Sequence, residues 1–409
     1  MPNALAEALP DPLSLHQAIA MAEDVQHYQI IEAEASLLAA QSVVEQAEAD
    51  LGFKAQLEIE AAYIEPSRIA FDKSSNDSRI SLRMTKPIYN FGSSAENIQA
   101  AQTEQVAIQS HMPYIIGLRK IDIAKQFFEV ILSDLKYAWD NEFMAVEYIR
   151  FESTQDRHAL SQVSDVDLLE SENNYINILH QRQLSEINQR HSRAILAELL
   201  NRPTELPSNL NFPELDFSKI ETLDYPELLE KVMLNNPQIE LAKKNLEAAS
   251  QRVSAAGKKF GPRLDAEVEV SEYSRVAGSH DEWRAQLNLV VPLYENSSIK
   301  KDVSRARAEW LKQRAELLSI EINIRKRVLA LWQKINVLSK RRKQLETSQD
   351  FRELRLDKSR ALYEMEVQTN LGSSMVAISE IQYKKAKNDF ELFLAMMQLR
   401  LISGETSLL

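Results

Sequence analysis

The chain has 409 residues, a net charge of −12 and no cysteine. An acidic surplus argues against nucleic acid as the principal ligand, since a phosphate backbone is bound by an excess of Lys and Arg. The absence of cysteine excludes disulfides, thiolate metal sites and cysteine nucleophiles. We therefore expect no nucleic-acid partner and no cofactor.

Residues 54–64 form the first strongly patterned segment after an alanine-rich helical run. Apolar side chains alternate there with polar ones, which is typical of a strand with one wet face. Residues 78–89 alternate in the same way, end in Pro87-Ile88-Tyr89 and continue into a long helical run. The sequence thus predicts a strand pair followed by long helices.

The second half of the chain repeats this plan. Strands are expected at residues 262–273 and 283–294, where Pro292-Leu293-Tyr294 follows Pro87-Ile88-Tyr89 by 205 positions (292 − 87). Such a repeat indicates an internal duplication. We divide the chain into a first repeat (residues 1–203), a connecting segment (204–224) and a second repeat (225–409).

Long rods are predicted for both repeats. No residue between Ser298 and about Met365 breaks a helix, and a helix of that extent would be roughly 100 Å long. Apolar residues recur in steps averaging 3.5, which specifies left-handed supercoiling of neighbouring helices. Each rod reverses once, near residues 161–167 and 366–372, where capping residues cluster.

The alternating strands allow two interpretations. On the strands alone, a soluble β-sandwich fits as well as a membrane wall. Each strand is close to the roughly ten residues that a tilted strand needs to cross a bilayer. Four strands cannot close a barrel and open edges are not tolerated in lipid, so the membrane interpretation requires several chains to share one barrel. The wet faces would then line the lumen with Glu58, Glu60, Arg83, Glu267, Glu269 and Arg284.

In this order the residues resemble the TolC-like outer membrane efflux family, which serves tripartite efflux pumps and type I secretion. The resemblance covers nearly the whole chain. It rests on Asn235-Asn236-Pro237, on the strands ending in Pro87-Ile88-Tyr89-Asn90-Phe91-Gly92 and Pro292-Leu293-Tyr294, on the reversals beginning at Arg157 and Arg360, and on Leu401-Ile402-Ser403-Gly404.

The resemblance implies an α+β protein in which long antiparallel helices form a coiled-coil tunnel. Four transmembrane strands per chain would contribute to a twelve-stranded barrel in a homotrimer. The expected location is the Gram-negative outer membrane, in contact with its lipid, with the tunnel extending into the periplasm. The expected partners are a periplasmic adaptor and an inner-membrane transporter, and the expected function is passive export without catalysis.

The resemblance also implies a latch at the periplasmic tip. Aligned on the reversals, Asp167, Tyr363 and Gln368 fall at the latch positions. Alternatively, Asp167 caps a helix and Tyr363 merely packs. The tip reversals themselves would be formed by Ser161, Asp165, Glu366, Thr369 and Gly372. Gly372 and Met375 stand where the family places a ring of aspartates, which puts an acidic constriction in doubt.

Other signals carry little chemistry. The seven histidines are scattered, and none forms an HExxH pair. Basic runs such as Lys340-Arg341-Arg342-Lys343 are expected to be solvated or paired with neighbouring carboxylates. The competing functional hypothesis is a soluble, elongated coiled-coil scaffold, which the rods alone would also support.

Overall fold

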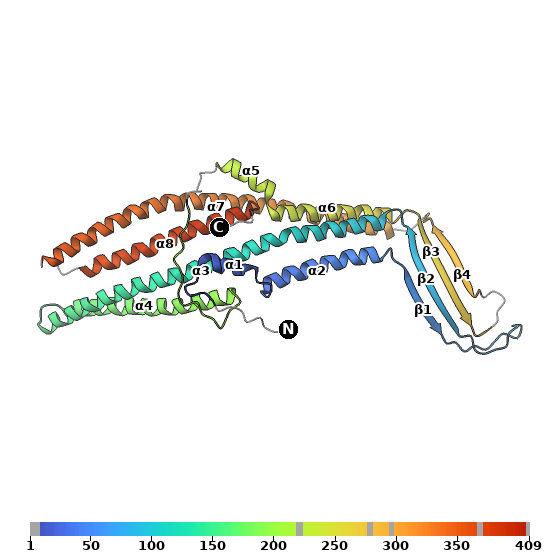
Figure 1. Ribbon diagram of the computed structural model, residues 1–409, viewed down its shortest axis with the longest axis horizontal. Helices are drawn as coiled ribbons and strands as arrows, with labels where there is room; N and C mark the ends of the chain where they lie inside the picture. The colour runs from blue at the N-terminus through green and yellow to red at the C-terminus, as the bar shows by residue number, and fades with distance from the viewer. Residues whose placement is uncertain (1–8, 218–223, 276–280, 294–297, 366–370, 406–409) are drawn as a thin grey trace. The chain divides into compact units, whose positions relative to one another are not determined.

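The computed structural model describes residues 9–217, 224–275, 281–293, 298–365 and 371–405. Two similar series of elements follow one another along the chain (Figure 1). The first series is α1 (Leu15–Ala20), the 3-10 helix η1 (Met21–Glu23), α2 (Tyr28–Ala49), β1 (Lys54–Glu60), β2 (Arg79–Tyr89), α3 (Ser93–Ala159) and α4 (Asp165–Leu199). The second series is α5 (Tyr225–Asn235), α6 (Pro237–Lys258), β3 (Arg263–Tyr273), β4 (Trp283–Val290), α7 (Ser298–Glu364) and α8 (Leu371–Ile402).

Contacts divide the chain into two units, and both series contribute to each. Unit 1 contains Met1–Ile31, Pro113–Asn236 and Asn323–Leu409, and unit 2 contains Glu32–Met112 and Pro237–Ile322. The predicted boundaries of the sequence repeats, by contrast, separate the chain at its middle. The helices α3 and α7 run without interruption from one unit into the other, through Pro113 in the case of α3.

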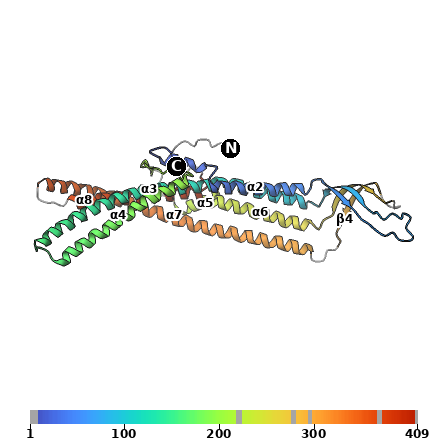
Figure 2. The same ribbon diagram turned by 90° about the horizontal axis from the view of Figure 1, so that it is seen from below.

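Unit 2 joins a four-stranded antiparallel sheet to a layer of helices. The strand order is β1-β2-β3-β4. The helices have a matching order: Gln102 of α3 lies 3.5 Å from Glu48 of α2, and Arg252 of α6 lies 2.5 Å from Glu104 of α3. An ion pair of 3.8 Å between Lys259 and Asp302 then joins the end of α6 to α7 (Figure 2). One edge of unit 2 is therefore formed by α2 and β1, and the opposite edge by α7 and β4.

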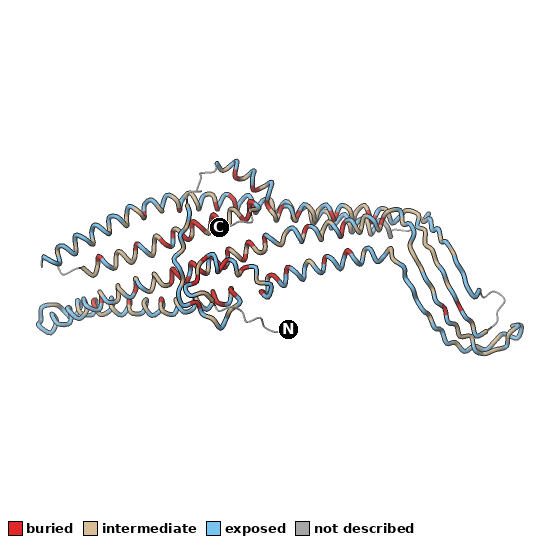
Figure 3. The backbone as a smooth tube through the Cα atoms, in the orientation of Figure 1, coloured by how far each residue is buried: buried red, intermediate tan, exposed pale blue. Residues whose placement is uncertain are grey.

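Unit 1 contains two helix hairpins, α3–α4 and α7–α8, around the main core. The rings of Phe128 on α3 and Phe390 on α8 stack at 4.3 Å, with 7° between their planes. Phe212 of the connecting segment lies 5.5 Å from Phe390. Buried residues recur along the hairpins near this core, whereas the hairpin ends are mostly exposed (Figure 3).

The duplication is also visible in the buried residues of the two hairpins, whose separation along the chain is constant. Buried residues follow one another by sevens along α4 and again along α8, at positions 203 apart (374 − 171, 381 − 178, 388 − 185). These are Ser171, Ile178 and Ser185 in α4, and Ser374, Ile381 and Asn388 in α8. The seven-residue spacing is that of a coiled-coil seam, so the predicted supercoil pattern appears in the buried faces of both short helices.

Two sequence motifs meet at the end of α8. The buried Asn236 donates from Nδ2 to the carbonyl oxygen of Ile402 (2.8 Å). Gly404 has φ +81°, and a Cβ there would lie 2.5 Å from the carbonyl oxygen of Asn235. Glycine is needed because the backbone is left-handed and a second chain segment lies close by. The Asn-Asn-Pro motif thus holds the end of the last helix.

Two strands are shorter than predicted. The first ends at Glu60, not at residue 64, because the loop after it closes on itself through Ile64 N–H to Ser75 O (2.9 Å). The fourth ends at Val290, before Pro292, whose nitrogen has no hydrogen for a ladder bond. Tyr294, the predicted last residue of that strand, lies outside the described residues.

Candidate functional site

The sheet of unit 2 has one polar and one apolar face, as strand register shows. Even-numbered residues of β1 pair with odd-numbered residues of β2 and β3, and these pair with even-numbered residues of β4. Side chains in one cross-strand row point to the same face. One such row contains Gln56, Arg83, Glu269 and Arg284. The six residues predicted to line a lumen therefore share one face.

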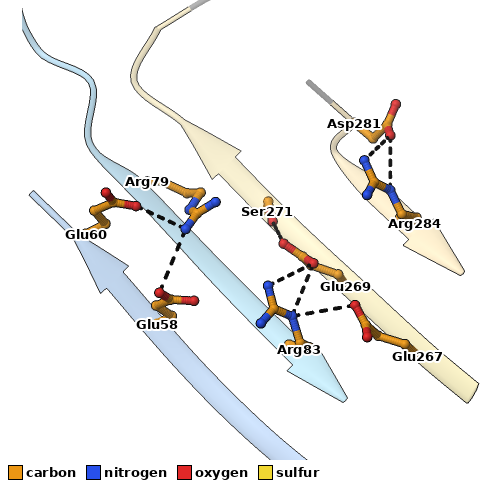
Figure 4. A network of polar contacts seen from close by, with 9 residues as sticks. All are labelled: Glu58, Glu60, Arg79, Arg83, Glu267, Glu269, Ser271, Asp281 and Arg284. Carbon is orange, nitrogen blue, oxygen red and sulfur yellow. Dashed lines mark hydrogen bonds and ion pairs between the residues drawn. The ribbon is translucent and has the colours of Figure 1, made fainter. Parts of the chain in front are cut away.

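Arg83 is the centre of the first charge cluster on this face (Figure 4). Its Nε and Nη2 atoms lie 3.3 Å from Oε2 of Glu269, and its Nε lies 3.6 Å from Oε1 of Glu267. Glu269 also accepts a 3.0 Å hydrogen bond from the Ser271 hydroxyl. One arginine thus balances two glutamates of the neighbouring strand.

A second arginine, Arg79, forms the other cluster. Its Nη2 lies 3.0 Å from Oε2 of Glu60 and 3.8 Å from Oε1 of Glu58. The sequence analysis omitted Arg79 from the lumen residues. It stands two and four residues before Ser81 and Arg83, so strand alternation would have placed it on the polar face.

Arg284 pairs with a residue outside the strands. Its Nη2 lies 2.8 Å from Oδ2 of Asp281, in the turn before β4, and Figure 4 shows this pair apart from the two clusters. Arg284 therefore lies on the predicted face, at the edge strand, but its ion pair is with a turn residue rather than with a glutamate of the strands.

The opposite face carries apolar side chains that the chain leaves uncovered. Trp283 is 69% exposed, Leu57 61% and Leu287 71%. Lys86 interrupts this face near one end of β2, and its ammonium group lies 4.5 Å above the Phe53 ring. A long cationic side chain held over an aromatic ring is typical of the boundary between an apolar surface and water.

The first tip reversal is held by local hydrogen bonds. Ser164 is the N-cap of α4: its hydroxyl accepts from the Asp167 N–H (3.2 Å), and the Asp167 carboxylate accepts from the Ser164 N–H (3.0 Å). Hydrogen bonds from Ser164 hold the pKa of Asp167 below its usual value. Ser161 adopts φ 57°, and Asp165 lies 2.6 Å from Nε2 of His158. Both residues therefore lie in the turn between α3 and α4 or directly after it.

The second tip is described only in part. Gln368, Glu366 and Thr369 lie outside the described residues. Tyr363 is 53% exposed, and its hydroxyl makes no hydrogen bond within the described part of the chain. Gly372 lies at the start of α8, where a Cβ would come within 2.7 Å of Val146 on α3. The single chain thus presents Asp167 in a capping box, and the latch stays a prediction.

No group of three or more His, Asp and Glu side chains is arranged to hold a metal ion among the described residues. None of the helices in the described ranges has the length and apolar character needed to cross a membrane.

A comparison with sequence models of protein families tests the resemblance to outer membrane efflux proteins. The sequence model of the family described as "Outer membrane efflux protein" matches residues 228–371. The predicted resemblance is confirmed, and the expected outer-membrane localisation agrees with this description. No curated protein matches the sequence.

The chain also shares its fold with solved outer membrane proteins that are 13–15% identical to it. The CmeC outer membrane channel of Campylobacter jejuni superposes with a TM-score of 0.76 at 13% identity, covering 96% of this chain and 86% of that one. VceC, an outer membrane protein of Vibrio cholerae, gives 0.72 at 15% identity, with 96% and 97% covered. MtrE, an outer membrane channel of Neisseria gonorrhoeae, gives 0.72 at 14%, with 96% and 89% covered. The predicted fold of long helices with a small antiparallel sheet is confirmed.

Proposed function

We propose that three copies of this efflux-family chain form one outer-membrane channel for passive export. Its four strands would form a third of a twelve-stranded barrel, and its helices a third of a periplasmic tunnel. An inner-membrane transporter and a periplasmic adaptor would deliver the substrate. No residue of the chain is assigned a catalytic role.

The observation that carries the proposal is the sheet with two open edges and two unlike faces. Open edges are not tolerated in lipid, so β1 of one copy must pair with β4 of another. Two copies would supply eight strands, the size at which side chains fill the interior of a barrel. Three copies supply twelve and leave room for water, which the clusters around Arg79 and Arg83 require on their side of the wall.

Mass and conductance test this proposal together. The full chain extracted from membranes in detergent is expected to have the mass of a trimer and to form conducting channels in planar lipid bilayers. The competing hypothesis, a soluble coiled-coil scaffold, predicts an elongated protein that stays in solution without detergent. A monodisperse monomer in the absence of detergent would overturn the channel proposal.

The latch is part of the proposal and has its own test. We expect Asp167→Ala and Tyr363→Phe to raise the conductance of the closed channel, because the first removes the acceptor and the second the donor of the proposed hydrogen bond between hairpin ends. Tyr148→Phe is the matched control, since the Tyr148 hydroxyl donates to Glu152 on its own helix (2.5 Å). Unchanged conductance in both latch variants would remove the latch and leave the channel intact.

A further inference from the structure

The two edge helices of unit 2 each have an apolar surface that their own chain does not cover. We infer that α2 of one copy packs antiparallel against α7 of the next copy, as a coiled-coil seam with acidic flanks on α2 and basic flanks on α7. This inference rests on the proposed ring of three copies, and it names the residues that close the ring outside the barrel.

The helix α2 has an uncharged outward side opposite its buried one. Ala33, Ala40 and Val44 are buried and lie on one side. The outward side carries no charge over roughly three turns, and all its residues are exposed: Ala35, Leu38, Ala39, Ser42 and Gln46. Leu38 and Ala39 stand three and four residues after Ala35, and Ser42 and Gln46 follow Ala39 at the same kinds of spacing. Residues spaced by three and four lie on one side of a helix. Such a surface is expected to meet another helix.

Acidic side chains flank this outward surface of α2 on both sides. Glu34 and Glu45 lie on one flank. Glu32 lies on the other flank, and Asp50, the residue directly after the helix, continues that second flank. All four are exposed. Asp50 has a partner in its own chain, Lys54 at 3.8 Å. Glu45 has no hydrogen bond or ion pair within the described residues, so its carboxylate is available to a neighbour.

The first part of α7 presents the complementary surface. Its outward side carries Leu311, Ala315, Leu318 and Ile322, in alternating steps of four and three, and all four are exposed. Basic residues flank it, with Arg307 and Arg314 on one side and Arg305 and Lys312 on the other. Apolar positions in steps averaging 3.5 with charged flanks are the pattern that sets partner and orientation in coiled coils. Acidic flanks on α2 therefore fit basic flanks on α7.

The contacts within unit 2 fix which residues meet. Rotation about a closed axis leaves the height of a residue unchanged, so matching heights within one copy also match between copies. The helices of this layer alternate in direction, and their heights are linked through Glu48 and Gln102, Glu104 and Arg252, and Lys259 and Asp302. Counting from these contacts brings Ala39 within two residues of the level of Leu318 and Ala35 within two residues of the level of Ile322. The same count places Glu45 between Arg307 and Arg314.

This register pairs small residues with large ones. Ala35 and Ala39 of α2 would face Ile322 and Leu318 of α7, an alternation that lets two helices approach closely. An open pocket of about 310 Å³ lies beside the seam, lined by Ser250, Val253, Arg307, Trp310 and Leu311. In the proposed seam, Glu45 of the neighbouring copy stands at the mouth of this pocket, next to Arg307.

The absence of native cysteine makes a direct cross-linking test possible. The full chain carrying Ala39→Cys and Leu318→Cys is purified in detergent, oxidised and run on a denaturing gel. We expect the monomer band to be lost to covalent dimer and trimer, with nothing larger, because each copy links to the next around a closed ring. The matched control is Gln41→Cys with Leu318→Cys, since Gln41 is exposed but lies on the other side of α2.

The outcomes separate the seam from the ring itself. A trimeric mass without cross-linking of Ala39→Cys to Leu318→Cys, or with equal cross-linking in the Gln41 control, overturns the seam and leaves the channel proposal standing. A monomeric mass overturns both.

Charge reversal provides a second measurement that does not depend on sulfur geometry. Glu45→Arg and Arg314→Glu are each expected to lower the fraction of trimer on dilution in detergent, and the double variant is expected to restore it. Equal or greater loss in the double variant would contradict the seam.

Discussion

The two helix hairpins of unit 1 have the same plan but different polar contacts. In the first, α3 and α4 are joined through Asp134, whose Oδ1 and Oδ2 lie 2.7 and 2.8 Å from Nη1 and Nη2 of Arg193. In the second, the residues 203 positions later are Val337 and Met396. There α7 and α8 are joined by Arg352 and Glu380 (2.7 Å), closer to the tip. The duplication thus preserved the apolar seam and let the ion pairs move.

The connecting segment explains part of this difference. Phe217 stands at the end of its first described stretch, and the guanidinium of Arg342 on α7 lies 4.4 Å from the Phe217 ring. Nε of Arg342 also lies 3.2 Å from Oδ1 of Asp389 on α8. The position equivalent to Arg342 in the first hairpin is Trp139, whose ring instead packs near Lys136 and Tyr383. The second hairpin is therefore adapted to carry the connecting segment.

Removing the aromatic centre of the second hairpin is expected to have the largest effect. Phe390 is 1% exposed and contacts both Phe128 and Phe212. Phe390→Ala should lower the free energy of unfolding by about 3–5 kcal/mol, because it removes a buried ring and leaves a cavity. Denaturant unfolding of the detergent-solubilised protein, followed by circular dichroism, measures the change.

The equivalent residue of the first hairpin is the control. Ile187 stands 203 positions before Phe390 (390 − 187) and is 63% exposed in the chain. Ile187→Ala should change the free energy of unfolding by less than about 1 kcal/mol. A cost near that of Phe390→Ala would show that another copy covers this side of α4 and that the hairpins are more alike than the single chain shows.

The strands and helices were predictable from sequence because each follows a local period. Steps of two marked the polar face of Arg83 and Glu269, and steps averaging 3.5 marked the buried seams. The ion pairs were less predictable, since Arg284 could reach either strand glutamates or Asp281, and only the turn geometry decides. Arg79 was missed although its alternation was visible. The role of Asn236 depends on a contact with Ile402 far along the chain, which no local pattern reveals.

The glycine at the second tip should have an intermediate effect. Gly372 lets the start of α8 approach Val146, whereas the residue 203 positions earlier, Leu169, points into solvent at 62% exposure. Gly372→Leu is expected to cost about 1–3 kcal/mol, because a side chain must displace Val146 or the helix. Hydrogen exchange of the first turns of α8 should accelerate.

The reverse change at the first tip tests the same difference. Leu169→Gly should cost only about 1 kcal/mol, the helix-propensity difference of glycine, and should leave α3 unaffected. Equal acceleration of exchange at both tips would mean that Gly372 has no special contact.

The smallest expected effect is the pH dependence that Asp389 of the second hairpin contributes to stability. Burial raises the pKa of Asp389, and the Arg342 guanidinium only partly opposes this. The carboxyl of the folded chain therefore retains its proton at pH values just above 3.8, the ordinary value, where the unfolded chain has lost it. Because this carboxyl binds more protons in the folded chain than in the unfolded chain within this window, its contribution to the free energy of unfolding should fall as pH rises through it.

Two substitutions test whether Asp389 causes this pH dependence. The measurement is the free energy of unfolding at a series of pH values, beginning at acid pH. Asp389→Asn removes the titrating group, so the fall above pH 3.8 should disappear, a change of slope of at most about 1.4 kcal/mol per pH unit. Arg342→Gln removes the cation that holds the pKa down, so the same fall should extend to higher pH. Identical profiles for the parent and Asp389→Asn would show that Asp389 does not titrate differently in the folded chain. The contrast between the hairpins would then rest on their packing and ion pairs, among them the Phe217–Arg342 contact, and not on proton binding by Asp389.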